Sequence, residues 1–386
     1  MSFLEGWSLS QDKEGLGGLY KLLGKISLKK KGFEGAYDLG REAVNRFEAL
    51  LHEISKDPRC MHVYELNKKR LLKRKHYVYA SYLAVLSSIP ILKSVPREVL
   101  LETILGKIAM IISIKTLDNI NDLWHSEEEA RASLTRQFNI LVGRGSDYRE
   151  DRTEVGMAEN FTYRLAEVTY DLLRRRGRHG GRMFQKYLQD FEKYIRGQAD
   201  SMLQKKAESL DIRKFLRDVN EKGVGNVWID IDFCVLEGLR DLSENELRSL
   251  ELIGKCVDLV FKGCNVYDDV ADLEEDLKSG IYNSVVYLAL DKGWCYDDNG
   301  VPSVSNKVKI EAVRLGDLLF LRGLDYLNET KKLTDIFDVD GIEYGLKILR
   351  IFSMRKWLSR VSNPLTIASA LMVKTSPSVL IYSDYI

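Results

Sequence analysis

Apolar positions recur every three to four residues along most of the chain, which is the period of an amphipathic α-helix. The pattern predicts helices over about 34–54, 65–88, 97–123, 127–142, 159–175, 183–206, 212–221, 227–239, 244–279, 283–290, 307–327 and 344–359. Long periodic segments with only 6 prolines argue against an all-β sandwich. No repeat of roughly 20 to 50 residues recurs, which argues against a solenoid. The sequence therefore predicts an all-α fold.

The predicted helices follow one another without a segment typical of an interdomain linker. We expect one α-domain over 61–375, an N-terminal helical elaboration over 1–60 and a C-terminal tail over 376–386. Ser243 and Glu246 have the spacing of a capping box, which predicts that a helix begins between them. Surface loops are expected over 143–152, 174–182 and 291–306.

Composition narrows the class of protein without identifying it. Of 386 residues, 45% are hydrophobic and 30% charged, which is typical of a globular protein. The 58 Lys and Arg residues balance 57 Asp and Glu residues, so bulk electrostatic binding to nucleic acid is not expected. Five scattered cysteines without a CxxC pair favour a reducing, cytoplasmic location. Neither a secretory signal nor an apolar run of roughly 20 residues is evident, so we expect no transmembrane segment.

One acidic cluster stands at the end of an apolar helix stripe. Asp268, Asp272 and Asp276 are spaced four residues apart and therefore share one face of the helix predicted over 244–279. The same face continues upstream with apolar residues, namely Leu250, Ile253, Val257, Val260, Phe261 and Cys264. Such a helix would line an apolar cavity and place carboxylates at the opening of that cavity.

The helix predicted over 97–123 repeats this design. Asp118 and Asp122 share a face with Ile104, Ile111 and Ile114, and Lys107 is the exception on that face. Carboxylates from two walls suit Mg²⁺, whereas zinc has little support because neither motif holds His or Cys at ligand spacing. Carboxylates at helix C-termini also oppose the helix dipole, which is a further reason to expect a bound cation.

Together the two acidic segments resemble the aspartate-rich motifs of class I isoprenoid synthases, which include terpene cyclases, squalene and phytoene synthases and chain-elongating prenyltransferases. The segment from Asp118 to Asp122 resembles the first motif, with Asn119 in place of its usual second Asp. The segment from Asp268 to Asp276 resembles the second, either as the cyclase triad Asp268, Asp272 and Asp276 or as the prenyltransferase pattern with Asp268, Asp269 and Asp272. The resemblance extends over roughly 75–360 and implies a helical bundle around an apolar cavity.

The resemblance implies a function and a set of site residues. Three Mg²⁺ ions would bind the diphosphate of a prenyl substrate and ionise it, and the chain would then cyclise or eliminate to a terpene with release of pyrophosphate. The implied metal ligands are Asp118, Asp122, Asp268, Asp269, Asp272 and Asp276. The implied diphosphate contacts are Lys222, Arg217, Lys278 and Arg355, the last at the place of the family's C-terminal Arg-Tyr pair.

Alternatives remain open from the sequence. A prenyltransferase of the same fold could join chains head to head or elongate them, although no Gly-Gly-Lys-x-x-Arg-like segment precedes the first motif. A non-catalytic scaffold could bind an isoprenoid or a protein. The basic run 174–182 could face anionic lipid, close over a diphosphate or bind nucleic acid, but a solvated helix–loop junction is favoured. His125 could approach the metals, although a lone His is more often structural. Peripheral membrane contact and a homodimer are also left open.

Overall fold

The computed structural model describes residues 32–33, 35–145, 148–202, 211–217, 223–293 and 306–386, and within these ranges every regular element is a helix. This confirms the all-α prediction. The α-helices are α2 (Ala36–Ile54), α3 (Val63–Lys68), α4 (Arg74–Ile91), α5 (Arg97–Trp124), α6 (Glu127–Leu141), α7 (Glu154–Arg176), α8 (Arg182–Met202), α9 (Ile212–Arg217), α10 (Gly225–Leu239), α11 (Glu244–Lys278), α12 (Ser284–Asp291), α13 (Asn306–Thr330), α14 (Val339–Leu358), α15 (Pro364–Leu371) and α16 (Pro377–Leu380), and a 3₁₀ turn, η3, spans Ser383–Tyr385.

Helix starts follow capping signals in the sequence. Ser243 caps α11, and the carboxylate of Glu246 accepts a hydrogen bond from the Ser243 N–H at 2.7 Å, which confirms the predicted capping box. Ser126 and Glu129 form a second capping box at α6. Each box satisfies backbone N–H groups that the first helical turn leaves without partners.

Two parts of the helix prediction were wrong. The helix predicted over 65–88 is two helices, α3 and α4, because the chain turns at Arg70, whose φ of 63° is incompatible with a right-handed helix. The periodic pattern of basic and apolar residues continues through this turn and so conceals it. Helices α15 and α16 were not predicted, although Pro364 and Pro377 occupy their first turns, a typical start signal, and Asn363 caps α15.

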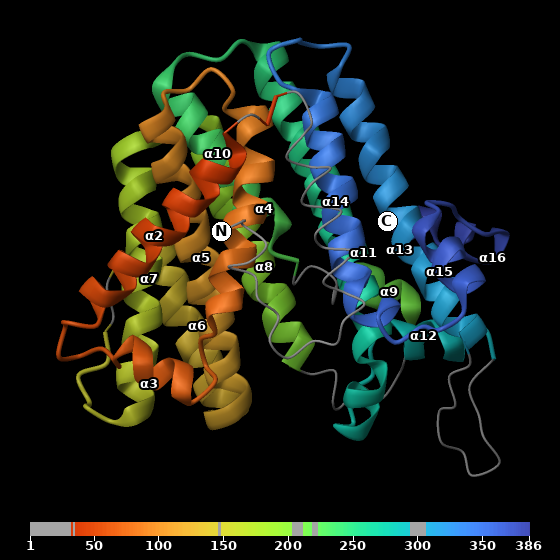
Figure 1. Ribbon diagram of the computed structural model, residues 1–386, viewed down its shortest axis with the longest axis horizontal. Helices are drawn as coiled ribbons and strands as arrows, with labels where there is room; N and C mark the ends of the chain where they lie inside the picture. The colour runs from red at the N-terminus through yellow and green to blue at the C-terminus, as the bar shows by residue number, and fades with distance from the viewer. Residues whose placement is uncertain (1–31, 34, 146–147, 203–210, 218–222, 294–305) are drawn as a thin grey trace.

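The long helices form one bundle in which three C-terminal ends lie at the same end. Figure 1 shows α5, α11 and α14 running in the same sense, from the top of the view to the bottom. Helix α11 packs against α10, α12, α13 and α14, while α5 packs against α4, α7 and α10. Helices α2 and α16 contribute Phe47 and Val379 to the same hydrophobic core. Within the described ranges, no helix is long and apolar enough to cross a membrane.

Buried ion pairs fix α10 inside the bundle. Asp232 accepts a hydrogen bond from Lys107 of α5, and neither side chain is exposed to solvent. Asp230 accepts one from Lys186 of α8 at 2.9 Å. Lys107, the polar exception on its predicted apolar face, therefore has a buried partner that the sequence spacing did not indicate.

We expect Glu246→Gln to lower the free energy of unfolding by about 1–2 kcal/mol at neutral pH. The side chain of Glu246 is 9% exposed, and its bonds to Arg240 and to Ser243 lower its pKa from 4.5 to about 2. Because the pKa is lower in the folded state, this stabilisation is complete above pH 4.5 and is lost as the pH falls through 2. Urea unfolding at neutral and at acidic pH measures it.

Glu244→Gln is the matched control, because Glu244 lies in the same turn with its side chain 76% exposed. Removing the charge of Glu244 should lower the free energy of unfolding by less than about 0.5 kcal/mol. Equal losses for the two variants at neutral pH would contradict the role given to Glu246.

Candidate active site

The last turns of α5 carry the first acidic motif. Asp118 and Asp122 stand one turn apart, and the side chain of Asp118 is 42% exposed. Lys115, one turn before Asp118, places its ammonium group 2.6 Å from the Asp118 carboxylate. The motif therefore carries its own basic side chain, which was not predicted although the i, i+3 spacing of Lys115 and Asp118 could have indicated it.

The asparagines of the first motif have structural partners. Asn119 donates a hydrogen bond to the carbonyl of Leu71 at 2.7 Å, and so ties α5 to the turn between α3 and α4. Asn121 accepts one from Ser133 at 2.8 Å. His125, 1% exposed, lies 3.0 Å from the Glu159 carboxylate. These contacts explain why the motif tolerates Asn119, and they favour the structural interpretation of His125.

The second acidic motif occupies the last turns of α11. Lys356 of α14 donates hydrogen bonds to Asp272 and, at 3.1 Å, to Glu275. Asn283, which caps α12, donates to the carboxylate of Asp276 at 2.7 Å. The carboxylates of the motif are therefore held by side chains from two neighbouring elements.

The carboxylate of Asp269 has a structural role that the other carboxylates of this motif do not share. Its carboxylate accepts the backbone N–H of Ser284 at 2.9 Å, and its carbonyl accepts a hydrogen bond from Asn283 at 2.9 Å. It thus anchors the start of α12 to α11. This geometry favours the triad of Asp268, Asp272 and Asp276 over the pattern that includes Asp269.

Carboxylates of both motifs act electrostatically on Lys115. Burial alone would lower the pKa of Lys115, but Asp118 and Asp122 of its own helix and Asp268 of α11 together raise it. Desolvation raises the pKa of Asp268 to about 6, with repulsion from Asp272 and Asp269 adding to it and Lys356 and Lys115 opposing it. The C-terminal ends of α5 and α11 add the negative ends of their dipoles. The arrangement is an acidic site that a cation would stabilise.

The carboxylates do not form a preassembled metal cluster. Among the described residues, no three His, Cys, Asp or Glu side chains are close enough together to hold a metal ion. Lys115 and Lys356 stand as the cationic partners of Asp118 and Asp272. All-oxygen donors from two helices suit Mg²⁺, which retains waters and substrate oxygens in its shell.

An apolar pocket lies beneath the acidic end. Val257 and Phe261 of α11 line it, and Phe261 precedes Asp268 by two helical turns, about 10 Å along the axis. Residues from three other helices complete it, namely Leu83, Leu86, Ser87 and Ile91 of α4, Trp228 and Ile229 of α10, and Ile342, Gly345, Leu346 and Leu349 of α14. The predicted apolar stripe of α11 therefore does reach an apolar interior.

Gly225 is required where α10 begins beside this pocket. A Cβ atom at Gly225 would lie 2.6 Å from the ring of Phe261, a separation that side-chain carbons do not adopt. The absence of a side chain lets α10 approach α11 closely, so that Trp228 packs edge-on against Phe261 with ring centroids 5.7 Å apart.

The predicted basic residues are placed differently from one another. Arg355 lies on α14 with its guanidinium 3.9 Å from the ring centroid of Phe352, while the next residue, Lys356, contacts the acidic motif. Lys278 is exposed at the end of α11, and Arg217 is exposed on α9. Lys222 lies outside the described residues. Lys356 was not predicted as a site residue, although it directly follows Arg355.

The basic run 174–182 lies at the opposite end of the bundle. Arg176 pairs with Glu102 in the first turns of α5, and Arg182 pairs with Glu244 at the start of α11, at 2.9 and 2.8 Å. Glu244 precedes Asp268 by about 36 Å of helix. The run therefore does not lie beside the acidic motifs, and the favoured interpretation as a helix–loop junction fits its ion pairs.

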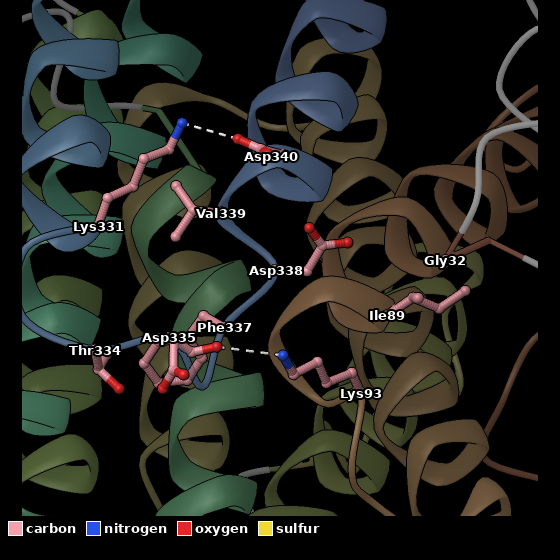
Figure 2. Close-up of a pocket in the computed structure, with 10 residues that line it drawn as sticks. All are labelled: Gly32, Ile89, Lys93, Lys331, Thr334, Asp335, Phe337, Asp338, Val339 and Asp340. Carbon is pink, nitrogen blue, oxygen red and sulfur yellow. Dashed lines mark hydrogen bonds and ion pairs between the residues drawn. The ribbon is translucent and has the colours of Figure 1, made fainter.

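A second hollow, shown in Figure 2, also lies far from the acidic motifs. It is lined by the segment before α14 and by the end of α4, and its charges have partners in the chain: Lys331 pairs with Asp340 at 2.8 Å, and Asp338 caps α14. Asp340 precedes Lys356 by about 24 Å of helix. We therefore do not place the active site there.

Comparison with known proteins shows the fold. No family model and no curated protein matches the sequence. The crystal structure of the SVS_A2 protein, from ancestral sequence reconstruction, aligns with a TM-score of 0.53 at 13% identity over 91% of this chain and 94% of that chain. A mutant of it aligns with a TM-score of 0.56 at 13% identity over 89% of each chain. A cucumene synthase mutant aligns with a TM-score of 0.46 at 10% identity over 84% of this chain and 95% of that chain. The chain therefore shares the all-α fold of the SVS_A2 structures.

Proposed function

We propose that the protein is a Mg²⁺-dependent, class I terpene synthase-like enzyme that ionises a prenyl diphosphate and releases pyrophosphate. One observation carries the proposal: the last turns of α5 and α11 hold Asp118, paired with Lys115, and Asp272, paired with Lys356, at the end of the bundle where an apolar pocket lies below. A prenyl diphosphate has an apolar chain and an anionic diphosphate group. It therefore matches an apolar pocket beside a cluster of carboxylates that can bind cations.

The donor set fits magnesium. Asp118 and Asp122 would hold metal from α5, and Asp268, Asp272 and Asp276 from α11, because these side chains present carboxylate oxygens at the same end of two helices. When bound, the metal supplies a Lewis acid that stabilises charge on the departing diphosphate. Asp269 is left out of this set because its carboxylate anchors the backbone of α12.

The chain's own residues have separate tasks in this proposal. Lys115 and Lys356, which pair with Asp118 and Asp272, would be available to contact the diphosphate when those carboxylates hold metal. Trp228 and Phe261 present aromatic rings to the pocket, where they can stabilise a carbocation by cation–π contact. The surrounding aliphatic side chains exclude water from the cation. Arg217, Lys222, Lys278 and Arg355 stay predicted diphosphate contacts.

A prenyltransferase of the same fold is the second candidate, since head-to-head joining also uses two acidic motifs. The position of Asp269 against α12 supports the cyclase triad over the elongation pattern. A non-catalytic isoprenoid- or protein-binding scaffold is the third candidate, and the acidic site would then have no chemical task.

One experiment separates these candidates. Purified protein is incubated with geranyl through heptaprenyl diphosphates, singly and with isopentenyl diphosphate, with and without Mg²⁺, while pyrophosphate and products are followed. We expect Mg²⁺-dependent pyrophosphate release from a single substrate, with a cyclic or eliminated hydrocarbon skeleton as product. Release that requires isopentenyl diphosphate would instead indicate elongation, and a coupled C–C product would indicate head-to-head joining. No metal-dependent turnover of any chain, alone or paired, would contradict an enzymatic function.

A further inference from the structure

The turn between α3 and α4 carries a dense group of basic side chains. Six of the eight residues in 68–75 are Lys or Arg. Two of them are engaged within the chain, because Lys69 pairs with Glu154 and Arg74 pairs with Glu48. Among the described residues, the side chains of the other four form no ion pair or hydrogen bond. The turn therefore holds positive charge that the chain itself does not neutralise.

Helix geometry places the end of this turn level with the first acidic motif. Helices α4 and α5 pack against each other and are joined by the short connection 92–96, so they run antiparallel. Lys75 precedes the end of α4 by 16 residues and Lys115 follows the start of α5 by 18, which are about 24 and 27 Å of helix from that connection. The hydrogen bond from Asn119 to the carbonyl of Leu71 fixes the turn against α5 at the same level.

The electrostatics of His76 agree with this placement. Burial and the charges of Lys115, Lys73 and Lys75 together lower the pKa of His76 from 6.5 to about 4. Lys115 is itself acted on by carboxylates of both acidic motifs. Lys73, Lys75 and Lys115 therefore form one group of cations at the acidic end of the bundle, which we call the lysine cluster.

Helix α4 also contacts the end of α14, which supplies further basic residues to the site. Tyr79 stands one turn after Lys75 and so shares its face of α4. The guanidinium of Arg355 on α14 lies over the ring of Tyr79, 5.6 Å from its centroid. The next residue, Lys356, contacts Asp272 of the second motif. The face of α4 that carries Lys75 is therefore directed toward the part of α14 that lies beside the second motif.

We propose that Lys73 and Lys75 bind the diphosphate group of the substrate from the side of α4. The inference rests on the proposed function and adds two contacts to that site. Ammonium groups form strong, charge-assisted hydrogen bonds with phosphate oxygens, whereas ionised carboxylates can only accept hydrogen bonds. Lys115 and Lys356 already pair with carboxylates of the motifs. Lys73 and Lys75, by contrast, can bind an anion without the loss of an ion pair.

Binding of inorganic pyrophosphate in the presence of Mg²⁺ tests the proposal without requiring turnover. The affinity of the wild type and of Lys73→Ala/Lys75→Ala is measured by isothermal titration calorimetry. We expect the double variant to bind at least about tenfold more weakly, because it loses two charge-assisted contacts. The variant is expected to fold, since Lys73 precedes α4 without a side-chain capping bond and Lys75 is exposed. Circular dichroism checks this before binding is measured.

Lys68→Ala/Lys332→Ala is the matched control, because it removes the same amount of charge. Both side chains are exposed, and neither has a partner in the part of the chain that the structure describes. Lys68 belongs to the same basic turn but is not among the charges that lower the pKa of His76, and Lys332 lies between α13 and α14, at the far end of α14 from the acidic motifs. This variant should bind pyrophosphate as the wild type does.

Nuclear magnetic resonance of the His76 ring tests the lysine cluster itself, without any ligand. Lys73 and Lys75 lower the pKa of His76, so their removal in Lys73→Ala/Lys75→Ala should raise it. The control variant should leave it unchanged. A pKa of His76 that is the same in all three proteins would show that the two lysines do not lie beside His76, and would overturn the proposal.

The outcomes separate this proposal from the proposed function. Equal affinity of the wild type and Lys73→Ala/Lys75→Ala for pyrophosphate would overturn the lysine contacts and leave the proposed function standing. An equal loss in both double variants would also overturn them, because the effect would then be one of overall charge. Failure of the wild type to bind pyrophosphate with Mg²⁺ would contradict both. Binding that depends on Lys73 and Lys75 in a protein without turnover would support the contacts and contradict only the enzymatic function.

Discussion

Asp272→Ala and Asp118→Ala should each abolish Mg²⁺-dependent release of pyrophosphate while leaving helicity and thermal stability largely intact. Each removes a carboxylate from one wall of the acidic site, and both side chains are partly exposed, at 30% and 42%, so that neither supports the core. We expect turnover to fall by about three orders of magnitude or more, since electrostatic stabilisation of the leaving group is the main task of such a site. Turnover and far-ultraviolet circular dichroism are the measurements.

A binding readout separates a metal site from any other cause of inactivity. Magnesium with inorganic pyrophosphate should raise the thermal midpoint of the wild type, because ligands that bind the folded state stabilise it. Asp272→Ala and Asp118→Ala should lose this shift. Glu274→Ala is the matched control: Glu274 is on the same helix, its side chain is 74% exposed, and it lies off the triad face. A variant of Asp118 or Asp272 that keeps wild-type turnover would show that its motif was misassigned.

Lys107→Met should lower the free energy of unfolding by about 3–5 kcal/mol, the range measured when one partner of a buried ion pair is removed. The side chains of Lys107 and Asp232 are both 0% exposed. Desolvation lowers the pKa of Lys107 and raises that of Asp232, which shows how strongly the interior disfavours either charge alone. Without the ammonium group, Asp232 would stay buried as an unpaired carboxylate or take up a proton. Urea unfolding of the wild type and the variant measures the loss.

The double variant Lys107→Met/Asp232→Leu provides the control. It replaces the pair by apolar side chains, so most of the lost stability should return. If Lys107→Met unfolds within about 1 kcal/mol of the wild type, Asp232 has found another partner and the pair does not hold α5 to α10.

The acidic faces were predictable because they depend on one helix at a time. A spacing of four residues places Asp268, Asp272 and Asp276 on one face whatever surrounds the helix. The starts of α6 and α11 were also predictable from the local sequence, because a capping box involves four consecutive residues. The turn at Arg70 was missed because hydrophobic periodicity continued across it while the backbone entered the left-handed region.

Partners from distant parts of the chain could not be predicted. Lys356 reaches Asp272 across 84 positions, and Lys107 reaches Asp232 across 125. On α14 the adjacent residues Arg355 and Lys356 point about 100° apart, so choosing between them required knowing which face of α14 meets α11. The same limit applies to Asp269, whose neighbour Ser284 becomes visible only when α12 folds back on α11.

The two buried carboxylates of α10 also restrict how this helix can move. Asp230 and Asp232 are two residues apart and therefore point about 200° apart around the axis, one toward Lys186 of α8 and the other toward Lys107 of α5. Turning α10 by one residue, or sliding it by one position, would separate both pairs at once and leave Lys107, Asp230 and Asp232 without these partners, whereas Lys186 would keep Asp190. Trp228 lies one turn before Asp232, so its orientation around the axis of α10, and with it its position in the pocket wall, is also fixed. We therefore expect any change in pocket shape on ligand binding to come from α4, α11 and α14, which supply the other lining residues.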